Sequence, residues 1–241
     1  MVSGKIKKKS KRPYPEITIT ENGPYLVSGK VPLRKEIIAI GPDNEPERWE
    51  KAETFKVEKS YALCRCGSSK NKPLCDGTHR IINFNGTETA ENSPYLKKAK
   101  KYTGQDLDLL DWPDICASAR FCHRAGSVWN LIKKSSDKKL KKIAIESACN
   151  CPSGRLVALE KSGKHIEPKL KQEIALVEDP QAKCSGSLWV KGKIPIKSSK
   201  GFYYEKRNRV TLCRCGASNN KPFCDGTHIA IGFKAEYKPK K

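Results

Sequence analysis

One sixteen-residue pattern that could bind metal occurs twice in the sequence: C-R-C-G-x-S-x-N-K-P-x-C-D-G-T-H. Both copies space three cysteines and one histidine as C-x-C-x8-C-x3-H, and each position of the first recurs 149 residues later. Thiolates and imidazole bind zinc and the irons of iron–sulfur clusters. The repeat therefore predicts two equivalent metal sites, with the ligand sets Cys64, Cys66, Cys75, His79 and Cys213, Cys215, Cys224, His228.

The ligands of each copy fall into two pairs. Cys64 and Cys66 are two residues apart, so in an extended segment both thiols point the same way and can reach one metal ion. Cys75 and His79 are four residues apart, so on a helical turn they share a face and can reach a second. We expect the eight residues between the pairs to form a loop that lets them converge. The spacing alone suits one tetrahedral zinc ion as well as a two-iron cluster.

The residues between the ligands favour the cluster. The motif resembles that of the CDGSH iron–sulfur domain of mitoNEET-like proteins, which bind [2Fe-2S] through three cysteines and one histidine. The match includes the Gly, Ser, Lys-Pro and Cys-Asp-Gly positions of both copies, while Thr78 and Thr227 replace the family's serine and keep its hydroxyl. The resemblance implies two [2Fe-2S] clusters held by Cys3His sites.

The same resemblance implies an architecture. Proteins of this family pair two protomers, whose strands form a cap over two cluster-binding lobes. Two copies in one chain can do this internally, so we expect a monomeric pseudo-dimer with pseudo-twofold symmetry. The expected fold class is α+β and mostly β, with short helices at the cluster loops and a small α-containing, ferredoxin-like insert.

The repeat extends upstream of the ligands. Residues 25–33 align with residues 188–196, and each segment predicts a strand, a Gly-Lys turn and a second strand that contains proline. Residues 60–63 and 209–212 predict strands that lead into the first cysteine. The first copy has 14 additional residues around positions 41–49, which we expect to form a surface loop. We divide the chain into an N-terminal CDGSH repeat at 14–90, a middle segment at 95–168 and a C-terminal CDGSH repeat at 169–241.

The middle segment has its own cysteines. Cys116, Cys122 and Cys151, the last within C-P-S-G, resemble the divergent single-cluster 4Fe-4S ferredoxins, and Cys149 is a candidate fourth ligand. The resemblance implies a third site that holds one 4Fe-4S cluster. The alternative is a ferredoxin-like spacer with buried free thiols. A helix is expected at residues 137–148, followed by Pro and Gly.

The composition indicates where and with what the protein works. Most of the eleven cysteines lie in metal-type spacings, which favours a reducing cytoplasm, and neither a secretory signal nor a membrane span is expected. The net charge is +22, but the lysines are dispersed, with dense runs only at 5–12 and 238–241. Few aromatic residues accompany them, so nucleic acid is not an expected partner. The expected partners are acidic redox proteins.

These observations predict an electron-transfer protein with redox partners of the flavoprotein or ferredoxin type, which also transfers clusters or senses redox state. No catalytic triad, acid–base pair or phosphate loop is recognisable, so we do not expect an enzyme. Two alternatives stay open: a zinc-stabilised nucleic-acid-binding module, and a subunit that feeds electrons to an oxidoreductase. The cations inside the motifs either balance the charge of the clusters or are solvated loop residues: Arg65, Lys72, Arg214 and Lys221.

Overall fold

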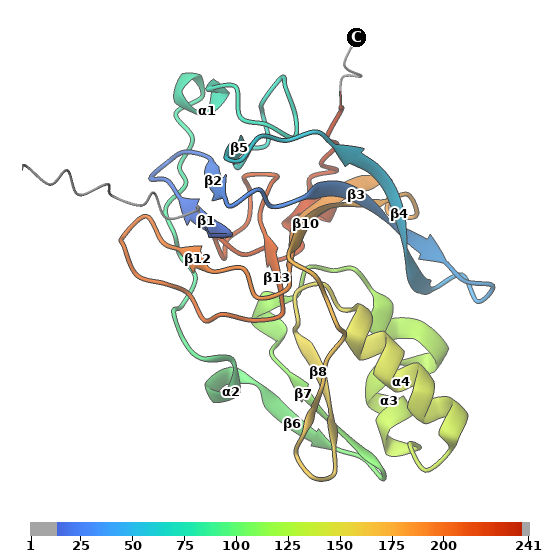
Figure 1. The fold of residues 1–241 in the computed structure, drawn as a ribbon. Coiled ribbons are helices and arrows are strands. Elements are labelled where there is room, and N and C mark those ends of the chain that lie inside the picture. Colours follow the sequence, from blue (N-terminus) through green and yellow to red (C-terminus); the bar gives the residue numbers. More distant parts are fainter. Residues whose placement is uncertain (1–13, 238–241) are drawn as a thin grey trace, which may run out of the picture.

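A computed structural model describes residues 14–237, in which strands outnumber short helices (Figure 1). The strands are β1 (Glu16–Ile19), β2 (Tyr25–Ser28), β3 (Leu33–Ile40), β4 (Pro46–Phe55), β5 (Tyr61–Leu63), β6 (Lys100–Thr103), β7 (Leu107–Asp111), β8 (Leu156–Glu160), β9 (His165–Ile166), β10 (Glu173–Asp179), β11 (Cys184–Lys191), β12 (Ile196–Lys197) and β13 (Arg209–Leu212). The helices are α1 (Thr78–Ile81), α2 (Tyr95–Lys98), α3 (Val128–Lys133), α4 (Lys138–Asn150) and α5 (Thr227–Ala230), with 3-10 turns η1 (Pro113–Ile115) and η2 (Phe121–Gly126). The expected α+β, mostly β class is confirmed.

Two of the three sheets combine strands from both repeats. Their strand orders are β12-β1-β2-β5 and β13-β11-β10-β3-β4. In the first sheet, β2 precedes the Gly-Lys turn of the first repeat and pairs antiparallel with β1, which in turn pairs in parallel with a strand of the second repeat. In the second sheet, β11 precedes the Gly-Lys turn of the second repeat and pairs antiparallel with β10, which pairs in parallel with a strand of the first repeat. The parallel pairs are β1 with β12 and β10 with β3. This reciprocal exchange supports the pseudo-dimer, which itself stays a prediction.

The repeated turns adopt the expected conformation. Gly29 and Lys30 have φ angles of 84° and 59°, and Gly192 and Lys193 have 73° and 60°. Glycine occupies such left-handed backbone without strain, which explains the recurrence of Gly-Lys. The strands expected before the first cysteines are confirmed as β5 and β13.

The surface loop predicted around residues 41–49 is confirmed for residues 41–45 and wrong for residues 46–49, which belong to β4. Strands β3 and β4 form a long antiparallel hairpin, which turns at residues 41–45. Apolar side chains explain the difference, because Trp49 stacks on Phe121 and Trp189 with ring centroids 4.8 and 4.7 Å apart. Trp49 Nε1 also donates to Asn150 O at 3.1 Å. The additional residues of the first repeat thus anchor the middle segment.

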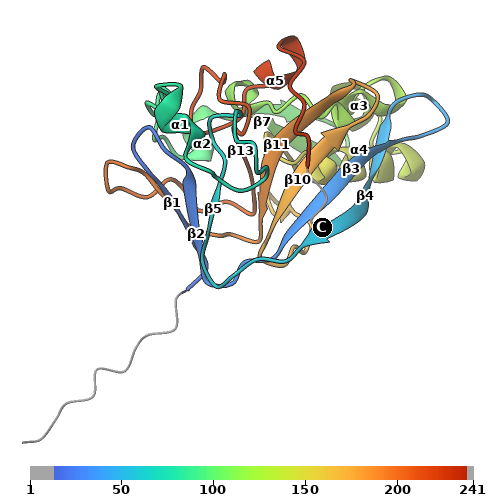
Figure 2. The same cartoon turned by 90° about the horizontal axis from the view of Figure 1, so that it is seen from above.

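One apolar core joins the two repeats. Its buried members come from β1, β2, β3, β10, β11 and β13, and include Ile17, Tyr25, Leu33, Ile174, Leu188 and Leu212. Figure 2 shows the strands of both repeats side by side, with α1 and α5 at the same upper edge of the view. The two cluster motifs are therefore held by one shared scaffold.

The middle segment packs as a separate layer at one end of the molecule (Figure 1). Its sheet has the order β6-β7-β8-β9 and is covered by α3 and α4 through a second apolar core. Asp137 caps α4 by accepting from the amides of Lys139 and Leu140 at 2.7 and 3.0 Å. The predicted helix is confirmed, but it continues to Asn150 and so includes Cys149.

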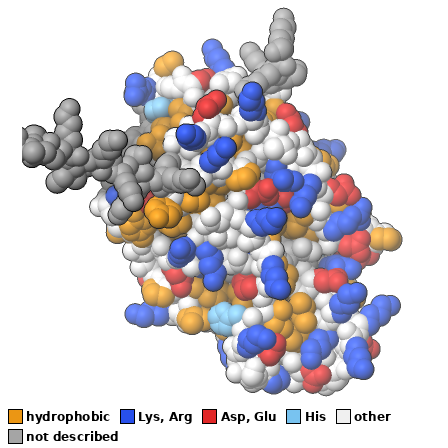
Figure 3. Space-filling model, viewed as in Figure 1, with side chains coloured by type: hydrophobic (Ala, Val, Ile, Leu, Met, Phe, Trp, Pro, Cys, Tyr) orange, Lys and Arg blue, Asp and Glu red, His pale blue; other side chains and the backbone are white. Residues whose placement is uncertain are grey.

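Lysines and arginines are scattered among acidic side chains over the face shown in Figure 3. The dense basic runs at 5–12 and 238–241 lie outside the described residues. Among the helices of residues 14–237, none combines the length and apolarity that a membrane crossing requires.

Candidate metal centres

The first motif holds its ligands in two close pairs. Cys64 follows β5 directly, and its Sγ lies 3.8 Å from Cys66 Sγ. Cys75 Sγ lies 3.4 Å from Nδ1 of His79, which α1 presents. The hydrogen bond that Cys64 shares with Cys66 is the main reason why the pKa of Cys64 falls to about 6. The pair therefore releases its first proton readily, as a metal ligand must.

Backbone bonds fold the intervening loop so that the pairs approach one another. The amide of Cys64 donates to Pro73 O at 2.9 Å, and that of Cys75 donates to Ala62 O at 2.9 Å. Asp76 accepts from the amides of Lys70 and Thr78 at 2.7 and 3.0 Å. Bonds from Thr78, its side chain foremost, lower the pKa of Asp76 well below its usual value. Asp76 thus accepts from the first residue of α1, although Gly77 is the capping residue.

The second motif repeats this geometry. Cys213 Sγ lies 3.7 Å from Cys215 Sγ, and Cys224 Sγ lies 3.3 Å from His228 Nδ1. Asp225 accepts from the amides of Asn219 and Thr227 at 2.8 and 3.0 Å. The thiol of Cys215 lowers the pKa of Cys213 to about 6.

The two C-x-C segments lie against each other. A Cβ on Gly67 would come within 2.4 Å of Cys215 O, and one on Gly216 within 2.5 Å of Cys66 O. Both glycines also have left-handed φ angles, 79° and 82°. The glycine after the second cysteine of each motif is therefore needed for the close approach of the two sites. The sequence repeat includes this glycine in both copies, but the repeat alone does not show that the two segments are in contact.

The two sites differ in their exposure. Cys75 and His79 are half-buried and open into a hollow of about 770 Å³ that also contains Arg80 and Phe84. In contrast, Cys224 and His228 are only 2% and 3% exposed. Burial, followed by the charge of Arg214, lowers the pKa of His228 to about 4. The second imidazole is thus held neutral, the form in which it binds metal.

The middle segment is what covers the second site. Asn220 Nδ2 donates to Asp114 O at 2.9 Å. A Cβ on Gly226 would lie 2.2 Å from Ser118 Oγ, whereas one on Gly77, the equivalent residue of the first motif, would meet nothing within 4 Å. Burial raises the pKa of Cys224, and the neighbouring thiolates of Cys213 and Cys116 add to this rise. The second site therefore contacts both the first motif and the cysteine-bearing loop of the middle segment.

The middle segment brings together three of its four candidate ligands. Cys116, Cys122 and Cys151 line one small hollow of about 20 Å³. Burial, with a smaller effect of Cys151, raises the pKa of Cys122 to about 12. Cys149 does not reach this hollow, because it lies in the last turn of α4 and its Sγ points to Ile166 O at 3.8 Å. Three of the four candidate cysteines thus line the same hollow, and Cys149 lies apart from them.

The arginines of the motifs are structural rather than solvated. Arg214 is buried, donates to Val177 O and Gly186 O at 2.5 and 2.7 Å, and pairs with Glu178 at 2.8 Å. Arg65 is also buried and donates to the carbonyls of Thr20 and Gly86, but it has no carboxylate partner among the described residues. Lys72 and Lys221 bond the carbonyls of Ser69 and Ser218 within their own loops, at 2.8 and 2.6 Å.

The distances within the pairs fit metal ligation. Two thiolates bound to one tetrahedral metal at about 2.3 Å lie about 3.8 Å apart, and a thiolate and an imidazole lie slightly closer. Both motifs have these separations. Within residues 14–237, however, no three His, Cys, Asp or Glu side chains are grouped so that they could hold a single metal ion. The close donors of each motif are one Cys–Cys pair and one Cys–His pair.

Family comparisons agree with the motifs. The iron-binding zinc finger family of CDGSH type matches residues 22–80 and 185–229. The divergent 4Fe-4S mono-cluster family matches residues 102–161, between the two copies. Searches of curated proteins and of solved structures each gave no match.

Proposed function

We propose that this chain, which matches the CDGSH-type family twice and a divergent 4Fe-4S mono-cluster family between the two copies, is an iron–sulfur protein that transfers electrons between redox partners. Each CDGSH motif holds one [2Fe-2S] cluster through three cysteines and one histidine. The middle segment holds one 4Fe-4S cluster through Cys116, Cys122 and Cys151. The clusters supply the one-electron chemistry, and the chain binds them, limits their contact with water and surrounds them with charge.

The division of each ligand set into two pairs carries this proposal. A zinc ion takes all four ligands at one centre, whereas a [2Fe-2S] cluster takes two ligands at each iron. The separate Cys–Cys and Cys–His pairs of both motifs support the second arrangement.

The two sites differ in exposure, and this difference indicates which of them a redox partner can reach. The first motif opens to the surface beside Arg80, and the second is enclosed by the middle segment. We propose that a redox partner, a flavoprotein or ferredoxin-like protein with an acidic surface, docks at the first site. The second site lies between the first motif and the middle-segment site, and it is used within the chain and not for partner docking. In this proposal the protein is a carrier and not itself an enzyme.

Metal analysis tests the proposal. Protein purified without oxygen is expected to contain about eight irons per chain with matching acid-labile sulfide: about four from the two CDGSH motifs and about four from the middle segment. Replacement of Cys116, Cys122 and Cys151 by serine should leave about four. Zinc without sulfide would contradict the cluster assignment and favour the nucleic-acid-binding alternative.

A further inference from the structure

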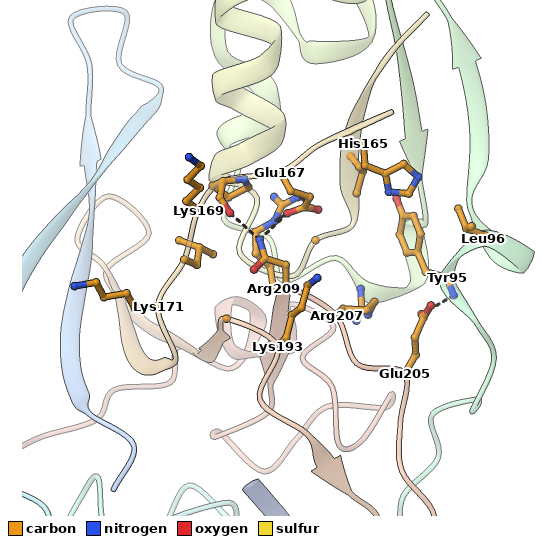
Figure 4. A pocket seen from close by; sticks show the side chains of 16 residues that line it. Tyr95, Leu96, His165, Glu167, Lys169, Lys171, Lys193, Glu205, Arg207 and Arg209 are labelled. Atoms are coloured by element: carbon orange, nitrogen blue, oxygen red, sulfur yellow. Dashed lines mark hydrogen bonds and ion pairs between the residues drawn. The ribbon is translucent and has the colours of Figure 1, made fainter. Parts of the chain in front are cut away.

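One large pocket contains none of the candidate metal ligands. It has a volume of about 820 Å³ and lies between the middle segment and the C-terminal repeat (Figure 4). Pockets of this size accommodate small organic molecules. It does not include His79 or the hollow at the first motif, so the proposed partner docking does not explain it.

The pocket has an apolar wall and a basic wall. Tyr95 and Leu96 of α2 form the apolar side together with Val157 of β8, while Lys169 and Lys171 lie opposite and Lys193 and Arg207 lie between them (Figure 4). Leu96 is 63% exposed, although it is a large aliphatic side chain. A ligand that satisfies both walls must combine an apolar body with negative charge.

The acidic residues of the pocket are already engaged. Glu167 accepts from Arg209 at 2.7 and 2.9 Å, and Glu205 accepts from the amide of Tyr95 at 2.7 Å. Within residues 14–237, no carboxylate lies within ion-pair distance of the four cations of the basic wall: Lys169, Lys171, Lys193 and Arg207. The three lysines of the basic wall therefore have no ion-pair partner among these residues, whereas the charge of Glu205 acts on Arg207 without a direct ion pair.

Arg207 is the least solvated of these cations. Its guanidinium lies 5.9 and 6.0 Å from the rings of Tyr95 and Phe223, and Nη1 donates to Ser153 O at 3.1 Å. Burial lowers the pKa of Arg207 to about 10, so it is still charged at neutral pH. An arginine fixed in this way presents its remaining N–H groups to an oxyanion without further ordering.

We propose that this pocket binds a small organic anion: a flat aromatic body on the Tyr95–Leu96 wall, with a phosphate or carboxylate on Arg207 and the three lysines. Such a ligand would cover the exposed Leu96 side chain and neutralise the cations at the same time.

The pocket also lies close to a candidate cluster ligand. Gly154 lines it, and Ser153, which binds Arg207, has its Oγ 3.5 Å from Cys151 Sγ. A redox-active ligand bound here would lie next to the middle site. This extension rests on the proposed function, whereas binding itself depends only on the pocket and can be measured separately.

Calorimetric titration of the full-length, cluster-loaded protein tests the proposal, with flavin mononucleotide as the probe because it joins a flat ring system to a phosphate. We expect saturable one-to-one binding, and binding of riboflavin, which lacks the phosphate, that is about tenfold or more weaker. Inorganic phosphate should compete only at far higher concentration. No measurable binding of flavin mononucleotide, or equal binding of riboflavin, would overturn the proposal.

Variants locate the binding. Lys169→Gln/Lys193→Gln changes two exposed residues of the basic wall and should weaken binding about tenfold or more. Lys138→Gln/Lys200→Gln makes the same change of net charge at exposed residues outside the pocket and should leave it unaltered. Arg207→Gln should give the largest loss, and its circular dichroism spectrum reports whether it still folds. Equal affinity of the two lysine double variants would contradict the proposal, even if all iron is present.

Discussion

The two CDGSH motifs have nearly the same sequence and the same internal bonds, yet they occupy different environments. Both hold a Cys–Cys pair and a Cys–His pair at matching distances. The first opens into a hollow of about 770 Å³, whereas the second histidine is only 3% exposed under the loop that contains Cys116 and Ser118. The motif thus determines how the ligands are held, and the middle segment determines which site can be reached from solvent.

The largest difference between the repeats is expected at their buried arginines. Arg214→Gln leaves the carboxylate of Glu178 without its cation, and loss of one partner of a buried ion pair costs about 3–5 kcal/mol. Arg65→Gln removes hydrogen bonds to two carbonyls but orphans no carboxylate, so about 1–3 kcal/mol is expected. Urea unfolding of both variants measures the two costs. Arg214→Gln/Glu178→Gln should recover part of the loss, and equal costs for the two single variants would contradict the assignment.

A matched pair of glycine variants tests the cover over the second site. Gly77 and Gly226 have φ angles of 90° and 87°, so alanine at either position should cost about 1–2 kcal/mol in backbone strain. Only Gly226→Ala also collides with Ser118, which should add about 1–3 kcal/mol. The midpoints of urea unfolding give this difference.

The collision between an alanine at position 226 and Ser118 can also be removed by a change at Ser118. Ser118 itself has a φ angle of 54°, so Ser118→Gly is compatible with its backbone. Gly226→Ala/Ser118→Gly should return to the stability of Gly77→Ala. If the double variant is as unstable as Gly226→Ala alone, the middle segment does not cover the second site in solution.

Iron release compares the exposure of the two clusters directly. Cys224→Ser should retain the first CDGSH cluster, and Cys75→Ser should retain the second. With the middle cysteines replaced by serine in both backgrounds, an excess of an iron chelator should remove iron severalfold faster from the protein that keeps the open site, because a buried site must first open locally. The time course of visible absorbance reports the two rates. A faster loss from the second site would reverse the comparison.

A smaller effect is expected from the contact that Tyr25 makes across the repeats. Its hydroxyl donates to Cys213 O at 2.7 Å, while the aligned residue of the second repeat, Leu188, has no hydroxyl. Tyr25→Phe should therefore cost about 1 kcal/mol in urea unfolding and should speed iron release from the second site only. Leu26→Ala, a change at the exposed neighbour of Tyr25, serves as the control. An equal effect of Tyr25→Phe on both sites would show that the contact acts on the whole core.

The sequence was informative wherever a local rule decides the structure. The spacing of Cys64 and Cys66, the Gly-Lys turns and the helix expected at 137–148 each depend on residues close in the chain, and the structure has all three. The repeat predicted two sites with the same internal geometry for the same reason. These features follow from backbone periodicity and side-chain bonding within a few residues.

Features that depend on contacts between distant segments were not predicted. The residues around Gly41–Trp49 were expected to form a loop because they are polar, but Trp49 packs on Phe121 and Trp189 and extends a hairpin. Cys149 is next to the right motif in sequence, but α4 turns it away from the other cysteines. The cover over His228 comes from Ser118, and no pattern within either segment encodes that contact.

The central claim is that each CDGSH motif divides its four ligands between two irons. Mössbauer spectroscopy of ⁵⁷Fe-labelled protein tests this most directly, with Cys116, Cys122 and Cys151 replaced by serine so that only the two motifs contribute. We predict two iron environments in equal amounts, one with two cysteine ligands and one with cysteine and histidine. A single iron environment, or a protein that holds zinc and no sulfide, would contradict the account.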